Sequence, residues 1–82
     1  MARDIDEVRQ QLALTIRTLR AQKQLSQERL ALDADVDRTY VSQIERAIGN
    51  PSLLVLCKLG LVLETDIAEL IGRESSPRRR LK

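Results

Sequence analysis

The chain has 82 residues, a formal net charge of +2, one cysteine and no histidine, and its only aromatic residue is Tyr40. This length allows one small domain, and a single cysteine excludes an internal disulfide, so we expect a cytoplasmic protein. The longest apolar run, residues 53–63, is interrupted by Lys58 and is shorter than the about 20 residues of a membrane-spanning helix. An enzyme is not expected, because histidine is absent and Cys57 has no base nearby in the sequence.

Helical periodicity and capping residues predict five helices over residues 4–72, and therefore a compact all-α domain. Asp4 and Glu7 have capping-box spacing at the start of a first helix over residues 5–22. The apolar positions of this helix recur at helical spacing: Ile5, Val8, Leu12, Ile16 and Leu19. Ser26 is a good N-cap for a second helix, whose inward face holds Leu30, Ala31 and Ala34.

A third helix is expected to begin after Asp37 and to turn three apolar residues inward: Val41, Ile44 and Ile48. Asn50-Pro51-Ser52 ends this segment, because the residue before a proline is driven out of the helical conformation. A fourth helix follows over residues 53–63, where we expect Cys57 to be a small buried apolar residue. Asp66 and Glu69 form a second capping box, for a short fifth helix that ends near Gly72.

Positive charge is concentrated at the C-terminus. Residues 1–72 carry nine Lys and Arg against eleven Asp and Glu, whereas residues 73–82 carry five against one. The last ten residues have no apolar periodicity, and we expect a disordered basic tail there. The run Arg78-Arg79-Arg80 is most often simply solvated, although it would also attract DNA without regard to sequence.

The second and third helices are short and are joined by a tight turn at residues 34–36, which is a helix-turn-helix arrangement. On a helical wheel, polar residues of the third helix fill an arc of about 140° opposite its apolar face. This reading arc consists of Arg38, Thr39, Ser42, Gln43 and Arg46, and it holds no acidic residue. Arg suits guanine, Gln suits adenine and hydroxyls suit bases or phosphates, which favours a major-groove reader over an ordinary solvated face.

Residues 27–46, QERLALDADVDRTYVSQIER, resemble the helix-turn-helix of the lambda-repressor-like (Xre/Cro) DNA-binding domains. The resemblance extends from about Ile5 to Ile71. The segment VDRTYVS, followed by IER and NPS, is most similar to controller proteins of restriction–modification systems and to regulators of mobile elements. The resemblance implies a homodimeric transcription factor on a pseudo-palindromic operator in double-stranded DNA. We expect no cofactor, and the sequence indicates no small-molecule ligand.

The resemblance also implies roles for single residues. Base edges would be read by Arg38, Thr39 and Gln43, with Ser42 beside them, whereas Gln27 would contact a phosphate from the start of the second helix. Arg20 and Glu45 match a pair that commonly forms a salt bridge between the first and third helices. Further phosphate contacts are expected from Arg46, Asn50 and Tyr40, although the Tyr40 ring would equally well merely flank the core.

Three departures from the family pattern carry expectations of their own. Asp35 replaces the usual glycine of the turn, and we expect a positive φ because Asp tolerates the left-handed conformation. Glu64 replaces a common helix-ending glycine. After the third helix, Ala47-Ile48-Gly49 replaces a glycine and basic residues, so phosphate contacts there must come from Asn50 or backbone N–H groups.

The fourth helix also departs from the family, because it is apolar at positions that are usually polar: Leu54, Val55 and Leu61. Leu54 and Leu61 are seven residues apart and so share one stripe, which a monomer would expose and a twofold dimer would bury. We expect a dimer interface of Leu54, Leu61, Val62, Ile67 and Ile71.

Alternatives remain open at this point. The protein could be an antitoxin-type or mobile-element autorepressor, or a protein–protein adaptor that keeps the scaffold without reading DNA. The negative balance of residues 1–72 favours the adaptor, whereas the acid-free reading arc opposes it. Residues 33–37, DADVD, resemble the start of a calcium loop, but Arg38 takes its glycine position and Ile44 its glutamate position, so we expect no metal.

Overall fold

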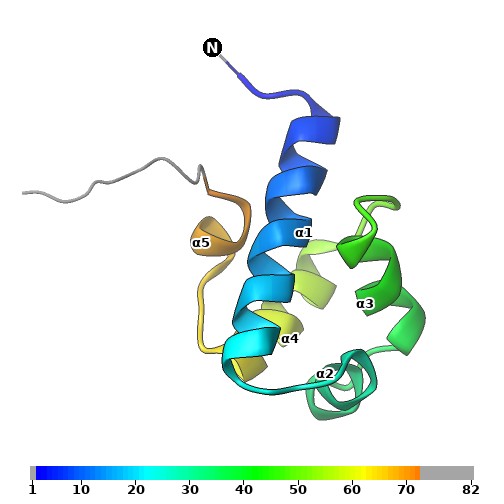
Figure 1. Ribbon diagram of the computed structural model, residues 1–82. Coiled ribbons are helices and arrows are strands. Elements are labelled where there is room, and N and C mark those ends of the chain that lie inside the picture. Colours follow the sequence, from blue (N-terminus) through cyan, green and yellow to red (C-terminus); the bar gives the residue numbers. More distant parts are fainter. Residues whose placement is uncertain (1, 73–82) are drawn as a thin grey trace, which may run out of the picture.

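The computed structural model describes residues 2–72, which form an all-α fold of five helices. Their bounds are α1 Ile5–Gln22, α2 Gln27–Ala34, α3 Arg38–Glu45, α4 Leu53–Leu63 and α5 Ile67–Ile71. In Figure 1, α1 is the central column, with α3 and α5 on its two sides and α2 near its C-terminal end. The predicted fold class is confirmed. The expected basic tail, residues 73–82, lies outside the described residues.

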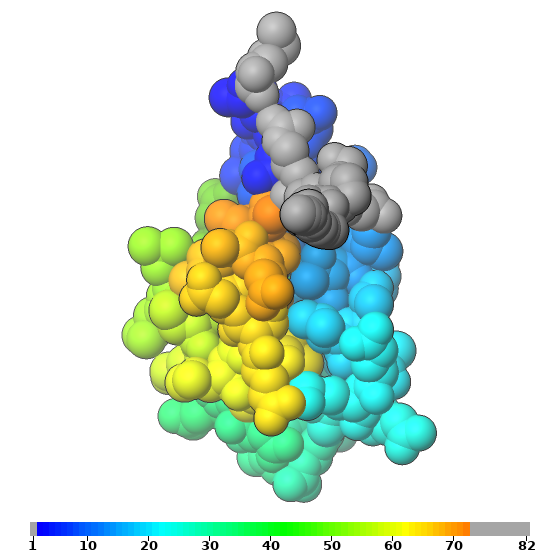
Figure 2. All heavy atoms as spheres, turned by 90° about the vertical axis from the view of Figure 1, so that its left-hand side faces the viewer, coloured from blue at the N-terminus to red at the C-terminus, as the bar shows by residue number. Residues whose placement is uncertain are grey.

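The five helices share one aliphatic core. Figure 2 shows the face on which α5 covers the junction between α1 and α4. Each fully buried Leu or Ile contributes about 1.5–3 kcal/mol, so a core without aromatic rings still suffices for a small domain. The core residues are Leu12, Ile16, Leu30, Ala31, Ala34, Val41, Ile44, Val55, Leu56, Leu59, Leu63 and Leu70.

The helices begin where the sequence places capping side chains. In the first capping box, Asp4 Oδ1 accepts from the Glu7 N–H at 2.9 Å, and Glu7 Oε1 accepts from the Asp4 N–H at 3.0 Å. The other N-caps are Ser26, Asp37, Ser52 and Asp66. Because each cap satisfies backbone donors that would otherwise be unpaired, the boundaries follow from local chemistry.

The turn between α2 and α3 has the expected backbone. Asp35 has φ 58° and ψ 49°, in the left-handed region, and its side chain is 99% exposed. The N–H of Val36 donates to the carbonyl oxygen of Ala31 at 3.0 Å and closes the turn. Glu64, which replaces the other glycine, is also left-handed, with φ 60°. Both acidic residues therefore take conformations that glycine adopts with less strain.

Two predictions about burial are wrong. Ile48 is 44% exposed, because α3 ends at Glu45 and the left-handed Ala47, with φ 60°, takes the chain off the helical path. Cys57 is exposed as well, because it lies on the face of α4 opposite the core residues Leu56, Leu59 and Leu63.

The exposed face of α4 is an apolar surface. We call it the outer stripe; its members are Leu53, Leu54, Cys57 and Leu61. Leu61 is 81% exposed and Leu54 is 65% exposed, whereas Val55 belongs to the core. The other residues expected in a dimer interface, Val62, Ile67 and Ile71, are partly buried against that core. An apolar stripe this exposed is typical of interaction surfaces.

Candidate nucleic-acid interface

The structure turns the reading arc outward. α3 packs on α1 and α2 through the fully buried Val41 and the nearly buried Ile44. On its other side, Arg38, Thr39 and Arg46 are exposed, and Ser42 and Gln43 are half-buried. Tyr40, at the edge of this arc, is 44% exposed. One side of α3 is thus anchored and the other is free to enter a groove of DNA.

In the described part of the chain, most of the cationic side chains without a carboxylate partner lie on or beside α3. Five cationic side chains pair with carboxylates: Arg9, Arg20, Lys23, Arg29 and Lys58. Within residues 2–72, the cations without such a pair are Arg3, Arg17, Arg38 and Arg46. Arg38 and Arg46 belong to the reading arc, and Arg17 reaches the end of α3 from α1. This distribution suits an anionic partner at α3, although residues 1–72 are negative in sum.

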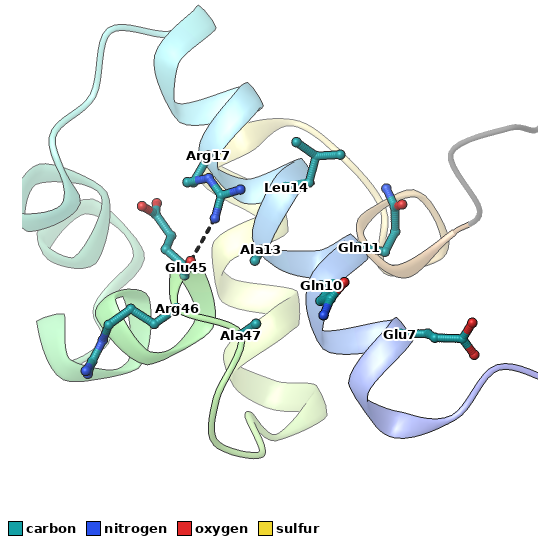
Figure 3. A pocket seen from close by; sticks show the side chains of 9 residues that line it. All are labelled: Glu7, Gln10, Gln11, Ala13, Leu14, Arg17, Glu45, Arg46 and Ala47. Carbon is teal, nitrogen blue, oxygen red and sulfur yellow. Dashed lines mark hydrogen bonds between the residues drawn. The ribbon is translucent and has the colours of Figure 1, made fainter.

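Arg17 is a residue that the sequence analysis missed. Figure 3 shows it above the hollow where α1 meets the end of α3, which is lined by the small residues Ala13 and Ala47. Its Nη1 donates to the main-chain oxygen of Glu45 at 2.8 Å, which leaves several guanidinium N–H groups free. The available signal was its position three residues before Arg20, which places both on one face of α1.

A buried carboxylate fastens α3 to the rest of the domain. Glu45 accepts from Arg20 at two points, Nε to Oε2 at 2.6 Å and Nη2 to Oε1 at 2.9 Å. Gln27 adds a third bond, from Nε2 to Oε1 at 3.0 Å. The ion pair that the resemblance implied between Arg20 and Glu45 is thus present. It joins α1 to α3, and Gln27 extends it to the start of α2.

The same contacts set the ionisation of Glu45. Burial raises the pKa of its carboxyl, but hydrogen bonds from Arg20 and Gln27 outweigh this. The positive charges of Arg20 and Arg17 also lower the pKa of Glu45, which therefore lies below its ordinary value. Glu45 is therefore a carboxylate at neutral pH, and its ion pair with Arg20 links α3 to α1.

The expected phosphate contacts differ in how they are held. Gln27 uses one hydrogen of its amide on Glu45, so its second hydrogen is the one left for a phosphate. Arg46 donates from Nε to the Ser42 carbonyl oxygen at 3.3 Å, and in Figure 3 it points away from the hollow. Asn50 is held from α1, since its Oδ1 accepts from Arg9 Nη2 at 2.7 Å.

Gly49 makes room for a residue of the reading arc. It has φ +82°, and a Cβ added there would lie 3.1 Å from Gln43 Oε1. Only glycine adopts this backbone freely and also leaves the Gln43 amide undisturbed. A larger residue at position 49 would therefore crowd the Gln43 side chain.

Comparisons with known proteins agree with this geometry. A family model described as helix-turn-helix matches residues 16–70, more than half of the chain. Control protein C.SmaI of Serratia marcescens is 37% identical over 71 residues, which cover 87% of this chain and 81% of that protein. The chain spans only 40% of the length of a longer relative, the transcriptional regulator SlrR of Bacillus subtilis, with 38% identity.

Two solved structures share the fold. The hypothetical transcription factor NHTF from Neisseria superimposes with a TM-score of 0.81 and 34% identity, over 90% of this chain and 83% of that one. The restriction-modification controller protein C.AhdI from Aeromonas hydrophila gives a TM-score of 0.71 and 39% identity, over 76% of this chain and 94% of that one. No helix within residues 2–72 is long and apolar enough to cross a membrane. The chain belongs to the helix-turn-helix family of DNA-binding transcriptional regulators, of the Xre or lambda-repressor-like type, and restriction–modification control proteins are among its relatives.

Proposed function

We propose that the protein is a sequence-specific regulator that binds a pseudo-palindromic operator as a homodimer. The observation that carries this proposal is the exposed, acid-free reading arc with its unpaired Arg38 and Arg46. A protein–protein adaptor on the same scaffold would have no need of free cations there. The protein acts by binding rather than by catalysis, in the cytoplasm, and residues 4–72 form the DNA-binding domain.

In this proposal one group of residues reads the bases and a second group contacts the DNA backbone. Arg38 stands at the start of α3, where a helix-turn-helix brings side chains nearest the base edges, and its fork matches the two acceptors of a guanine. Thr39, Ser42 and Gln43 read neighbouring bases. The DNA backbone is contacted around them by Gln27, Tyr40, Arg46 and Asn50.

The outer stripe of α4 is the proposed twofold interface, with Val62, Ile67 and Ile71 beside it. Burying the outer stripe of both subunits would cover Leu61 and Leu53, the two most exposed large apolar side chains within residues 2–72, together with Leu54. A dimer then presents two α3 helices to half-sites about 34 Å apart, one turn of DNA.

Among possible contexts, control of a restriction–modification system is favoured by the similarity to C.SmaI and C.AhdI. An antitoxin or mobile-element repressor would use the same surfaces.

The function is tested by selecting bound sequences from random duplex DNA. We expect enrichment of an inverted repeat, because a twofold dimer reads the same half-site twice. A folded protein that enriches no sequence would favour the adaptor and end the proposal.

The interface is tested separately, by sedimentation of the Leu61→Glu variant. We expect a folded monomer, because a charge would be buried without a partner in the dimer. The matched control is Leu32→Glu, on α2, since Leu32 is 67% exposed and lies outside the outer stripe. This control should remain dimeric. A wild-type monomer at tens of micromolar would contradict the proposed dimer.

A further inference from the structure

The loop between α3 and α4, residues 46–52, has no basic side chain after Arg46, yet it follows the reading arc directly. The structure brings a cation to it from α1. Arg9 Nε donates to the Gly49 carbonyl oxygen at 2.9 Å, and Arg9 Nη2 donates to Asn50 Oδ1 at 2.7 Å. One planar guanidinium therefore holds both the main chain and a side chain of a loop 40 residues away.

The Arg9 side chain is well placed for this task. It is 24% exposed, whereas its other partner Asp6, at 3.2 Å, is 77% exposed. An ion pair that open to solvent contributes little, so the two bonds to the loop are the more significant contacts. They attach the loop to α1 in addition to its covalent link with α3.

These bonds determine which hydrogen-bond donors of the loop remain available to a ligand. A guanidinium can only donate, so the end of the Asn50 amide that faces Arg9 must be the oxygen. The NH₂ end is consequently directed elsewhere. Within residues 2–72, neither this NH₂ group nor the main-chain N–H groups of Gly49 and Asn50 has a protein acceptor. Two consecutive residues thus carry three donors without a protein acceptor among the described residues, and such donors are available to an oxyanion.

We propose that Arg9 is the residue that positions the Gly49–Asn50 segment for the backbone phosphate that Asn50 contacts in the proposed function. This inference rests on the proposed function, since the phosphodiester belongs to the DNA that the reading arc contacts. Arg9 acts through Asn50 and Gly49 and does not itself touch the DNA. It replaces, from α1, the basic side chains that the loop lacks.

A double-mutant cycle tests the coupling. Wild type, Arg9→Lys, Asn50→Ala and the double variant are each titrated with the selected operator duplex and with random duplex DNA. Lysine keeps the charge of Arg9 but lacks the fork that holds Gly49 and Asn50 together. We expect each single variant to lose about tenfold in affinity on both DNAs, because one charge-assisted hydrogen bond to phosphate is lost. The double variant should lose no more than about twofold beyond the singles, since both changes remove the same contact.

Two further variants separate positioning from folding and from charge. Asn50→Asp retains an oxygen for Arg9 but replaces the NH₂ donor with a second acceptor and a negative charge, so it should remain as stable in urea as wild type and still lose at least about tenfold in affinity. Arg29→Lys changes an arginine that pairs with Asp33 on α2, and it should bind within about twofold of wild type.

The proposal is overturned if Arg9→Lys binds like wild type, because the charge alone would then suffice. It is also overturned if the double variant loses the product of the two single losses, because the residues would then act independently. A wild-type protein that prefers no sequence in the selection experiment refutes the proposed function instead, so the two failures are distinguishable.

Discussion

Among the contacts that join α3 to α1 and α2 through Glu45, Arg20 and Gln27, replacing Glu45 with alanine should cause the largest loss of stability. The Glu45 side chain is 4% exposed and accepts three hydrogen bonds, two from Arg20 and one from Gln27. Its loss would leave the Arg20 guanidinium, whose side chain is 23% exposed, with only the Leu25 carbonyl oxygen at 2.8 Å. Breaking a buried ion pair from one side costs about 3–5 kcal/mol, and the partial exposure of Arg20 favours the lower end.

A loss of about 3 kcal/mol is a large share of the stability of a domain of this size, which is about 4–12 kcal/mol for 82 residues. With a urea m-value of about 1 kcal/mol/M, the unfolding midpoint should fall by about 3 M. The matched control is Asp33→Ala, which breaks the surface pair with Arg29 and should change stability by less than about 0.5 kcal/mol. A Glu45→Ala variant within 1 kcal/mol of wild type would refute the anchoring role.

The same network predicts a pH dependence. Because the folded state lowers the pKa of Glu45, its stabilisation is complete above the unfolded pKa of about 4.3 and is lost as the pH falls through the folded pKa. The difference in unfolding free energy between wild type and Glu45→Gln should therefore be constant above about pH 5 and should shrink as the pH falls below about 4.3. An equal difference at pH 7 and pH 3 would show that the carboxylate charge is irrelevant to this network.

Substitutions at two further positions, Asp35 and Arg17, examine the turn and the charge beside α3. Asp35→Gly should keep or slightly raise stability, whereas Asp35→Val should lower it by about 1 kcal/mol or more, because a β-branched residue is strained at φ 58°; equal urea midpoints for the two variants would contradict the turn geometry. Arg17→Gln retains a donor for the Glu45 carbonyl oxygen but removes the unpaired charge, so it should weaken operator and random DNA alike and reduce the salt slope of binding by about one ion per subunit. Arg29→Gln, which removes an already paired charge, should leave that slope nearly unchanged, and a parallel fall in both variants would assign the effect to net charge alone.

The limits of sequence-based prediction follow the range of the interactions. The helix starts at Asp4, Ser26 and Asp37 were predictable, because a capping side chain acts within three residues. The left-handed Asp35 was predictable for the same reason, since its conformation depends on the turn itself. The Arg20–Glu45 pair spans 25 residues and was expected only through the family resemblance.

The errors arose where local pattern carries no information. α4 is apolar on nearly every side, so periodicity could not show that Cys57 faces outward while Leu56 faces the core. Ile48 continued the apolar spacing of α3 beyond the point at which the helix ends. The contacts of Arg9 with Gly49 and of Arg17 with Glu45 depend on how α1 packs against distant segments, and no short sequence motif predicts them.

The most direct test of the central claim, that α3 reads DNA sequence, is the ratio of operator to random-duplex affinity for wild type and for Arg38→Ala. Wild type should prefer the operator by at least about 10³-fold. Arg38→Ala should lose about 1–3 kcal/mol per half-site on the operator, with a relaxed preference at one base pair and little change on random DNA. Equal losses on both DNAs would make Arg38 a phosphate contact and move base reading to Thr39 and Gln43. A wild-type protein with equal affinity for both duplexes would contradict sequence reading by α3 altogether.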